Sequence, residues 1–225
     1  MLGPAIGDLL PSAVGVALSP VPIVAVILVL GTPRARSNGP AFALGWVAGL
    51  VVVSVVVLIV AGGADDPDSG TSDAVDVVKL LFGLLLLAVA WQQWRKRPRA
   101  GQEPEMPPWM SALDHFTAGR SLGLGALLSG VNPKNLALTL AAVAGIAQAG
   151  LSTGDEVTAV AVFVLLGSLT VAGPVVAYMV AGERVRRPLD RAKQFMADEN
   201  AVIMAVVCLV LAAKLIGDGI AGLTD

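Results

Sequence analysis

Long stretches with almost no charged residue constrain this chain more than any other feature of its sequence. No charged residue lies between Asp8 and Arg34, and five more apolar stretches of similar length follow, broken only by isolated charges. A bilayer core about 30 Å thick needs about 20 apolar residues per helix, and in lipid a continuous helix pairs its backbone groups internally. The pattern predicts an all-α integral membrane protein with six transmembrane helices. The expected spans are residues 9–31, 41–63, 75–94, 121–147, 157–181 and 201–219.

The composition agrees with a membrane protein and excludes several other classes. Hydrophobic residues make up 56% of the chain and charged residues only 14%, whereas a soluble domain carries about 25% charged residues. A net charge of −2 leaves no excess of basic residues to neutralise the phosphates of a nucleic acid. One cysteine, Cys208, and one histidine, His115, exclude a disulfide framework and a metal centre built from several such ligands. We expect no metal and no cofactor.

The basic residues predict the orientation. They concentrate in the loops after the first, third and fifth spans, whereas the loops after the second and fourth spans carry acidic residues and no basic ones. Because basic loops stay in the cytoplasm, both chain termini are expected outside. The basic residues of the three loops are Arg34, Arg36, Arg95, Lys96, Arg97, Arg99, Arg120, Arg184, Arg186, Arg187, Arg191 and Lys193.

With three spans each, the two halves of the chain cross the membrane in opposite directions. Such 3+3 inverted repeats recur in transporters. We expect a first three-helix repeat at residues 1–94, a cytoplasmic linker at 95–120 and a second three-helix repeat at 121–225. The linker is rich in proline, and residues 109–116 are expected to form a short amphipathic helix at the membrane interface.

Two proline motifs interrupt the first and the fourth span near their centres. Proline inside a helix removes a backbone hydrogen bond and clashes with the preceding turn, while Ser or Asn followed by Pro is typical of a helix start. Helices 1 and 4 are therefore expected to be broken near the midplane. The amide groups and positive dipole ends of the two second halves would converge on one region. The motifs are Ser19-Pro20-Val21-Pro22 and Asn132-Pro133-Lys134-Asn135.

Lys134 adds a formal positive charge to this region. Burying a lysine at the centre of a span costs about 2.5–3.5 kcal/mol on insertion scales, which favours a functional role over a structural ion pair, for which Asp8 is the nearest acidic candidate in the first span. Structural kinks are the alternative for Pro20 and Pro22. Helix N-termini together with a cation favour an anion such as a phosphate, a sulfate or a carboxylate. The candidate substrate-binding residues are Ser19, Pro20, Pro22, Asn132, Pro133, Lys134 and Asn135.

Other spacings predict local structure. Two charged pairs at helical spacing are expected to form local ion pairs, and two pairs of glycines four residues apart are expected to serve helix packing. The charged pairs are Asp76 with Lys79 and Lys214 with Asp218, and the glycine pairs are Gly45 with Gly49 and Gly119 with Gly123.

Four segments spread over nearly the whole length carry a resemblance to a known family. They are Leu18-Ser19-Pro20-Val21-Pro22; Pro107-Pro108-Trp109-Met110 ahead of Leu113-Asp114; Ser129-Gly130-Val131-Asn132-Pro133-Lys134-Asn135-Leu136; and Gly173-Pro174 followed by Gly182-Glu183-Arg184. On these motifs the chain resembles the GAP family of the LysE exporter superfamily, also called sulfolipid-addressing or glycopeptidolipid-addressing proteins. The resemblance implies a LysE-like fold in the bacterial cytoplasmic (inner) membrane and the export or translocation of glycolipids.

The leading functional hypothesis is a multi-pass transporter that translocates or exports an anionic lipid or glycolipid, with the headgroup bound by the broken-helix N-termini and Lys134. Two alternatives stay open: an exporter of small solutes such as amino acids, and a non-transporting accessory subunit of an envelope-lipid export machinery. The chain has no P-loop and no nucleophile–base set, so an enzyme is not expected. Expected partners are the lipid or glycolipid substrate and proteins of envelope-lipid synthesis or export, and an oligomer is compatible with the sequence.

Overall fold

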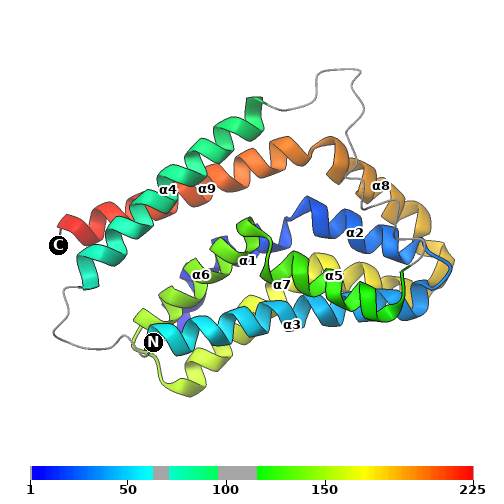
Figure 1. Ribbon diagram of the computed structural model, residues 1–225, viewed down its shortest axis with the longest axis horizontal. Helices are drawn as coiled ribbons and strands as arrows, with labels where there is room; N and C mark the ends of the chain where they lie inside the picture. The colour runs from blue at the N-terminus through cyan, green and yellow to red at the C-terminus, as the bar shows by residue number, and fades with distance from the viewer. Residues whose placement is uncertain (1, 63–70, 96–115, 225) are drawn as a thin grey trace. The chain divides into compact units, whose positions relative to one another are not determined.

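The computed structural model describes residues 2–62, 71–95 and 116–224, and these residues form helices joined by short turns, with no strand among them (Figure 1). The all-α expectation is therefore confirmed for this part of the chain. The interfacial helix expected at residues 109–116 lies outside the described residues, apart from its last residue. The helices are α1 (Leu2–Ala17), α2 (Pro20–Leu30), α3 (Ala35–Gly62), α4 (Thr71–Arg95), α5 (Ala118–Gly130), α6 (Pro133–Gln148), α7 (Thr153–Ala181), the 3-10 helix η2 (Gly182–Val185), α8 (Arg186–Asp198) and α9 (Asn200–Thr224).

Several of these helices are long and apolar enough to cross a membrane. Within the described residues, three stretches satisfy this condition singly: Ala35–Val60, Thr153–Asp198, which runs from α7 through η2 and α8, and Asn200–Leu223. Helices α1 and α2 satisfy it together as a bent pair. The apolar part of α4, Leu80–Arg95, is shorter. These helices support a membrane protein with three or four spans by length and composition, and the count of six stays a prediction.

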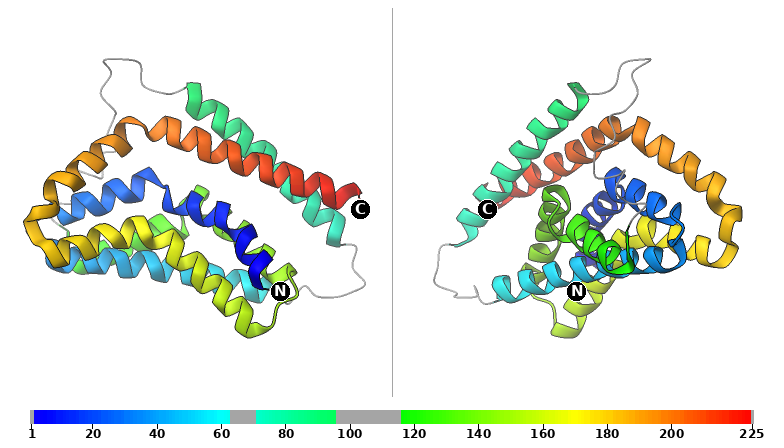
Figure 2. Two further views of the ribbon diagram at one scale, coloured as in Figure 1. Left: turned by 180° about the vertical axis from the view of Figure 1, so that it is seen from behind. Right: turned by 45° about the vertical axis from the view of Figure 1, so that its right-hand side comes forward.

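The first and the fourth expected span are both broken, as the proline motifs predict. Helix α1 ends at Ala17 and α2 begins at Pro20, with an angle of 51° between the two helices. The bend lies between the dark-blue and the lighter blue helix in Figure 2. Likewise, α5 ends at Gly130 and α6 begins at Pro133. A proline at the first helical position prevents the preceding helix from continuing, because its ring clashes with the preceding turn.

The helices form two compact units. The first contains α1 to α3 and α5 to α8, and the second contains α4 and α9. In the first unit α3 lies against α5, α6 and α7, and α1 lies against α6 and α7. Its interior is filled by large, fully buried side chains, among them Phe42, Trp46, Leu50 and Phe163. In the second unit α4 and α9 lie side by side along their length (Figures 1 and 2).

Small residues allow the closest of these approaches. A Cβ atom added at Gly45 of α3 would overlap the backbone of Leu122, and one added at Gly125 of α5 would overlap the backbone of Phe42. The packing role predicted for Gly45 and Gly49 is thus confirmed. The same prediction for Gly119 and Gly123 is wrong, because a Cβ atom at either would meet no atom within 4 Å. On α5 the contact face carries Ser121, Gly125 and Ser129, all three buried.

A hydrogen-bonded junction of two broken helices

The candidate site is the place where the second halves of the two broken helices begin. Asn132 is the N-cap of α6, with extended backbone angles, and its Oδ1 atom accepts a hydrogen bond from the backbone N–H of Lys134 at 3.1 Å. Ser19 is the N-cap of α2, also with an extended backbone, but its side chain does not cap the helix. Both N-cap residues therefore have an extended backbone, but only the side chain of Asn132 caps its helix.

Three side chains form a chain of hydrogen bonds across the junction. The Lys134 ammonium donates to Ser19 Oγ at 2.9 Å, and Ser19 Oγ donates to Asn135 Oδ1 at 2.7 Å. Asn135 Nδ2 in turn donates to the carbonyl oxygen of Leu128, on α5, at 2.9 Å. Each group donates in the same direction, and such aligned bonds polarise and strengthen one another in a medium of low dielectric. The predicted site residues of the two motifs are thus brought into direct contact, although 115 positions separate Lys134 from Ser19 in the chain.

The burial of these residues is graded. Ser19 is 4% exposed and Asn135 is 0% exposed, whereas the Lys134 side chain is half-buried. Pro20 and Pro22 are buried within the first turn of α2. The two remaining candidates, Asn132 and Pro133, are half-buried and exposed, respectively. The junction therefore has a buried polar base with a cation at a more accessible position.

Both breaks leave carbonyl groups without a helical partner, and side chains satisfy two of them. Thr170 Oγ1, on α7, donates to the carbonyl oxygen of Ala17 at the end of α1 at 2.5 Å. Asn135 does the same for Leu128 near the end of α5. An unsatisfied backbone group in lipid costs several kcal/mol, so these two side chains stabilise the breaks. Thr170 is missing from the sequence-based prediction, because a threonine in an apolar span ordinarily bonds within its own helix.

The half-helices offer fewer backbone donors than the sequence-based interpretation assumed. Pro20 and Pro22 carry no amide hydrogen, and neither does Pro133. The amide of Lys134 is already bonded to Asn132, and that of Ile23 to the carbonyl of Ser19 at 3.2 Å. The positive potential of the junction therefore comes mainly from the Lys134 ammonium and from the aligned peptide dipoles of the two helices.

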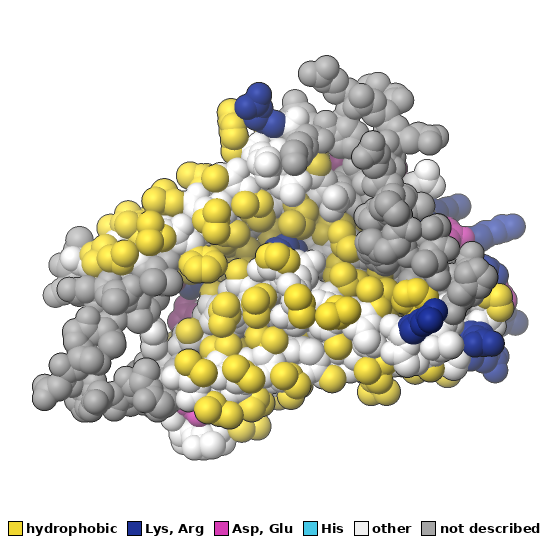
Figure 3. Space-filling view, in the orientation of Figure 1, with side chains coloured by type: hydrophobic (Ala, Val, Ile, Leu, Met, Phe, Trp, Pro, Cys, Tyr) yellow, Lys and Arg dark blue, Asp and Glu magenta, His cyan; other side chains and the backbone are white. Residues whose placement is uncertain are grey.

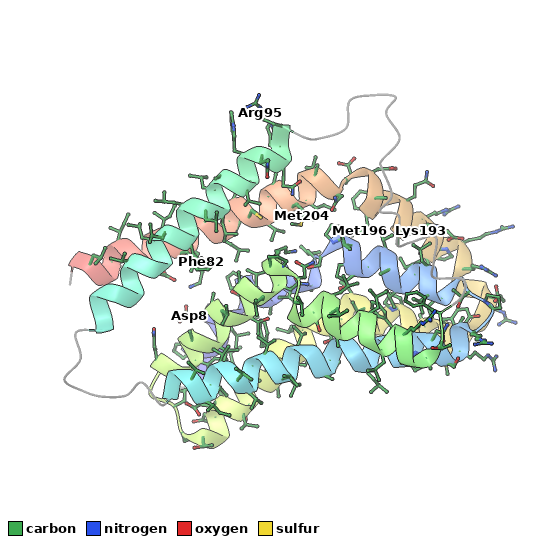
Figure 4. All side chains as sticks on the ribbon, in the orientation of Figure 1. Asp8, Phe82, Arg95, Lys193, Met196 and Met204 are labelled. Carbon is green, nitrogen blue, oxygen red and sulfur yellow. The ribbon has the colours of Figure 1, made fainter. Side chains whose placement is uncertain are left out.

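The charged residues considered as partners or pairs lie elsewhere. Asp8 is exposed on α1, well before the break (Figure 4). Lys214 Nζ and Asp218 Oδ2 are 3.2 Å apart on α9, so this predicted ion pair is confirmed. The side chains of the other predicted pair, Asp76 and Lys79, lie outside the described residues.

A second polar cluster holds the far end of α2. Arg186 Nη2, on α8, donates to the carbonyl oxygen of Gly31, the C-cap of α2, at 3.0 Å. Its Nη1 atom lies 2.8 Å from Glu183 Oε2, and Tyr178 donates to the other oxygen of Glu183 at 3.1 Å. The expected fifth span ends at residue 181, so Glu183 lies outside it. The hydrogen bond from Arg186 lowers the pKa of Glu183, helped by the bond from Tyr178. Helix α2 is thus held by side-chain hydrogen bonds at its N-cap, Ser19, and at its C-cap, Gly31.

Comparison with known proteins identifies the family. A family model described as Sap, sulfolipid-1-addressing protein, matches residues 9–221, which include both proline motifs and the segment around Gly182. The chain belongs to the sulfolipid-1-addressing protein family. Searches of curated proteins and of solved structures give no match. The family predicted from the motifs is therefore confirmed, and the relation of the sulfolipid-1-addressing proteins to the LysE superfamily stays a prediction.

Proposed function

We propose that this chain is a transporter that translocates or exports an anionic lipid or glycolipid, and that it is not an enzyme. In this proposal the negatively charged headgroup binds at the junction of the two broken helices. Lys134 supplies the charge, and Ser19 and Asn135 hold the ammonium in place. Membership of a family named for addressing sulfolipid-1 supports a lipid substrate with an acidic headgroup.

The observation that carries the proposal is the bond between Lys134 and Ser19. A lysine in an apolar span is costly, and here the hydrogen bond holds it beside the starts of both half-helices. The two positive dipole ends raise the cost of the cation further, because like charges repel. An anion placed at the junction would offset the cost of burying the ammonium and its repulsion from the two helix dipoles. We infer that the arrangement favours the bound state of a sulfate or phosphate group.

The helix order supports the larger architecture assumed by the proposal. The broken pair α1–α2 is followed by α3 and α4, and the broken pair α5–α6 is followed by α7 and, after α8, by α9. In this order α1–α2 corresponds to α5–α6, and α3 corresponds to α7. The contact of α3 with α5 therefore corresponds to the contact of α7 with α1, and both contacts are present. In the second unit α4 lies against its counterpart α9. We propose a 3+3 inverted repeat with six spans in the bacterial cytoplasmic membrane, with both termini outside.

The test uses purified protein in proteoliposomes and measures the transbilayer movement of a labelled sulfated glycolipid and of its neutral analogue. Lys134→Ala removes the cation and is expected to reduce movement of the sulfated lipid about 10- to 100-fold, which corresponds to the 1.5–3 kcal/mol of a charge-assisted hydrogen bond. Lys134→Arg keeps the charge and should retain more activity than Lys134→Ala. The matched control is Lys214→Ala, which removes a lysine of the ion pair on α9 and should leave the rate unchanged.

Each other outcome counts against the proposal in a defined way. Equal movement by wild type and Lys134→Ala would overturn the role of the junction. Lys134-dependent flux of an amino acid, without lipid movement, would support a small-solute exporter instead. No movement of any substrate by the isolated protein, with recovery when a co-purified partner is added, would support an accessory subunit.

A further inference from the structure

A surface of exposed arginines lies at one end of the first unit. Three segments of the chain meet there: the connection from α2 to α3, the residues just before α5, and the start of α8. Arg186 of α8 donates to the carbonyl oxygen of Gly31, and Asn38 of α3 donates to that of Phe116 at 2.9 Å. Figure 3 shows dark-blue basic side chains gathered at the end that carries α8. We call the following exposed residues the arginine surface: Arg34, Arg36, Arg120, Arg184, Arg187 and Arg191.

Glu183 and Asp190, the acidic residues next to these arginines in the chain, are paired with other basic residues. Glu183 is paired with Arg186 at 2.8 Å, and Asp190 lies 3.6 Å from Lys193. Within the described part of the chain, no residue of the arginine surface forms an ion pair. The six arginines are thus exposed, and none of the acidic residues that the structure describes neutralises them.

The residue type indicates the ligand chemistry. Apart from Lys193, every basic residue of these segments is an arginine, whose planar guanidinium binds a phosphate through two parallel hydrogen bonds and is less strongly hydrated than a lysine ammonium. Helix α8 is also strongly amphipathic. Its residues Leu189, Met196 and Lys193 are half-buried, while Phe195 is 56% exposed. An exposed aromatic ring beside arginines is typical of a helix that lies in the headgroup region of a membrane.

From this charge and this amphipathic helix we propose that the arginine surface binds the headgroups of anionic phospholipids in the cytoplasmic leaflet. This inference needs the proposed orientation of the chain and does not depend on what the junction transports. The leaflet is complementary in charge, and each basic side chain near an anionic surface contributes about 1 kcal/mol, or about fivefold in affinity. The surface would hold α8 and the attached end of α2 at a fixed depth in the leaflet.

The test measures lipid selectivity of the full chain in detergent. Native mass spectrometry with equal amounts of phosphatidylglycerol and phosphatidylcholine gives the ratio of bound lipids. The wild type is expected to favour phosphatidylglycerol about a hundredfold or more, and Arg184→Gln/Arg187→Gln/Arg191→Gln to lose most of that preference, since three arginines together account for roughly a hundredfold. Lys214→Gln, a single charge removed from α9, should keep the wild-type ratio, whereas Arg191→Gln should lower it about fivefold.

Folding and other ligands are controlled separately. The triple variant replaces exposed side chains and is expected to unfold at the wild-type temperature; if it does not fold, the comparison of Arg191→Gln with Lys214→Gln decides. An unchanged lipid ratio in the folded arginine variants, or a wild type that binds both lipids equally, would overturn the proposal. Loss of a co-purifying acidic protein from the triple variant at an unchanged lipid ratio would also overturn it and point to a protein partner.

Discussion

Ser19 and Asn132 begin helices with the same residue pattern, and yet only Asn132 caps its helix. A capping side chain accepts from the amide of the second or third helical residue. In α2 the third residue is Pro22, which has no amide hydrogen, so one of the two donors is missing. The Ser19 hydroxyl instead donates to Asn135 and accepts from Lys134. The second proline of the motif thus removes one of the two amides that could hold the Ser19 hydroxyl in a cap.

Replacing Ser19 with alanine tests that assignment. Ser19→Ala removes both bonds and leaves the Lys134 ammonium and the buried Asn135 amide each without one partner, which is expected to lower the free energy of unfolding by about 1–3 kcal/mol. Thermal unfolding in detergent measures the stability, and lipid movement in proteoliposomes should fall with it. Ser37→Ala is the matched control, since Ser37 is exposed and bonds only near its own turn. Equal unfolding temperatures for the two variants would show that the bonds at Ser19 contribute nothing.

Ser54 is a buried hydroxyl in the opposite situation. Ser54 is 0% exposed on α3, and its Oγ has no hydrogen-bond partner among the residues that the structure describes. Burying an unpaired hydroxyl costs about 1–3 kcal/mol in proteins. Ser54→Ala is therefore expected to keep or raise the unfolding temperature, as measured by thermal unfolding in the same detergent. A marked loss of stability would mean that Ser54 has a partner in the membrane, such as a water molecule or a lipid group.

At the scale of helices, the sequence predicts where they break more reliably than which faces meet. The breaks follow from proline, which acts on its own neighbours. The contact face of α5 depends on how far the helix is rotated about its axis, and both Gly119/Gly123 and Gly125/Ser129 have the spacing of a packing motif. Only the tertiary fold selects Gly125. Lys134 could be recognised from the sequence because its charge lies in an apolar span. The bond from Thr170 to Ala17 could not be predicted, because it depends on how α7 packs against α1.

The two glycine registers give a matched pair of variants. Gly125→Ala places a methyl group against the backbone of Phe42 and is expected to destabilise the protein by about 1–3 kcal/mol, the usual cost of overpacking. Gly123→Ala meets open space and gains helix propensity, so its unfolding temperature should equal or exceed that of the wild type. Thermal unfolding of both variants in one detergent makes the comparison. The reverse order of stability would show that α5 packs in the register predicted from Gly119 and Gly123.

Over the whole molecule, local and long-range features differ in how far the sequence predicts them. The positions of the helices follow from apolar stretches and proline. The grouping of α4 with α9 in a unit of their own does not, because it joins segments that are far apart in the chain and carry no distinctive motif. The membrane orientation depends only on the distribution of basic residues. An inverted repeat depends on this orientation, because its two halves must begin on opposite sides of the membrane. In such a repeat α1 and α7 begin on the same side.

Cysteine labelling tests this orientation. In a Cys208→Ser background, single cysteines are introduced at Asp8, Ser37 and Ser152, which are exposed and lie outside the polar junction. Cells are then treated with a membrane-impermeant maleimide. Asp8→Cys and Ser152→Cys should react in intact cells, because the start of α1 and the start of α7 face outward, whereas Ser37→Cys should react only after the membrane is permeabilised. Labelling of Asp8→Cys and Ser37→Cys from the same side would mean that α1 and α2 do not cross the membrane together, and the inverted repeat would then be wrong.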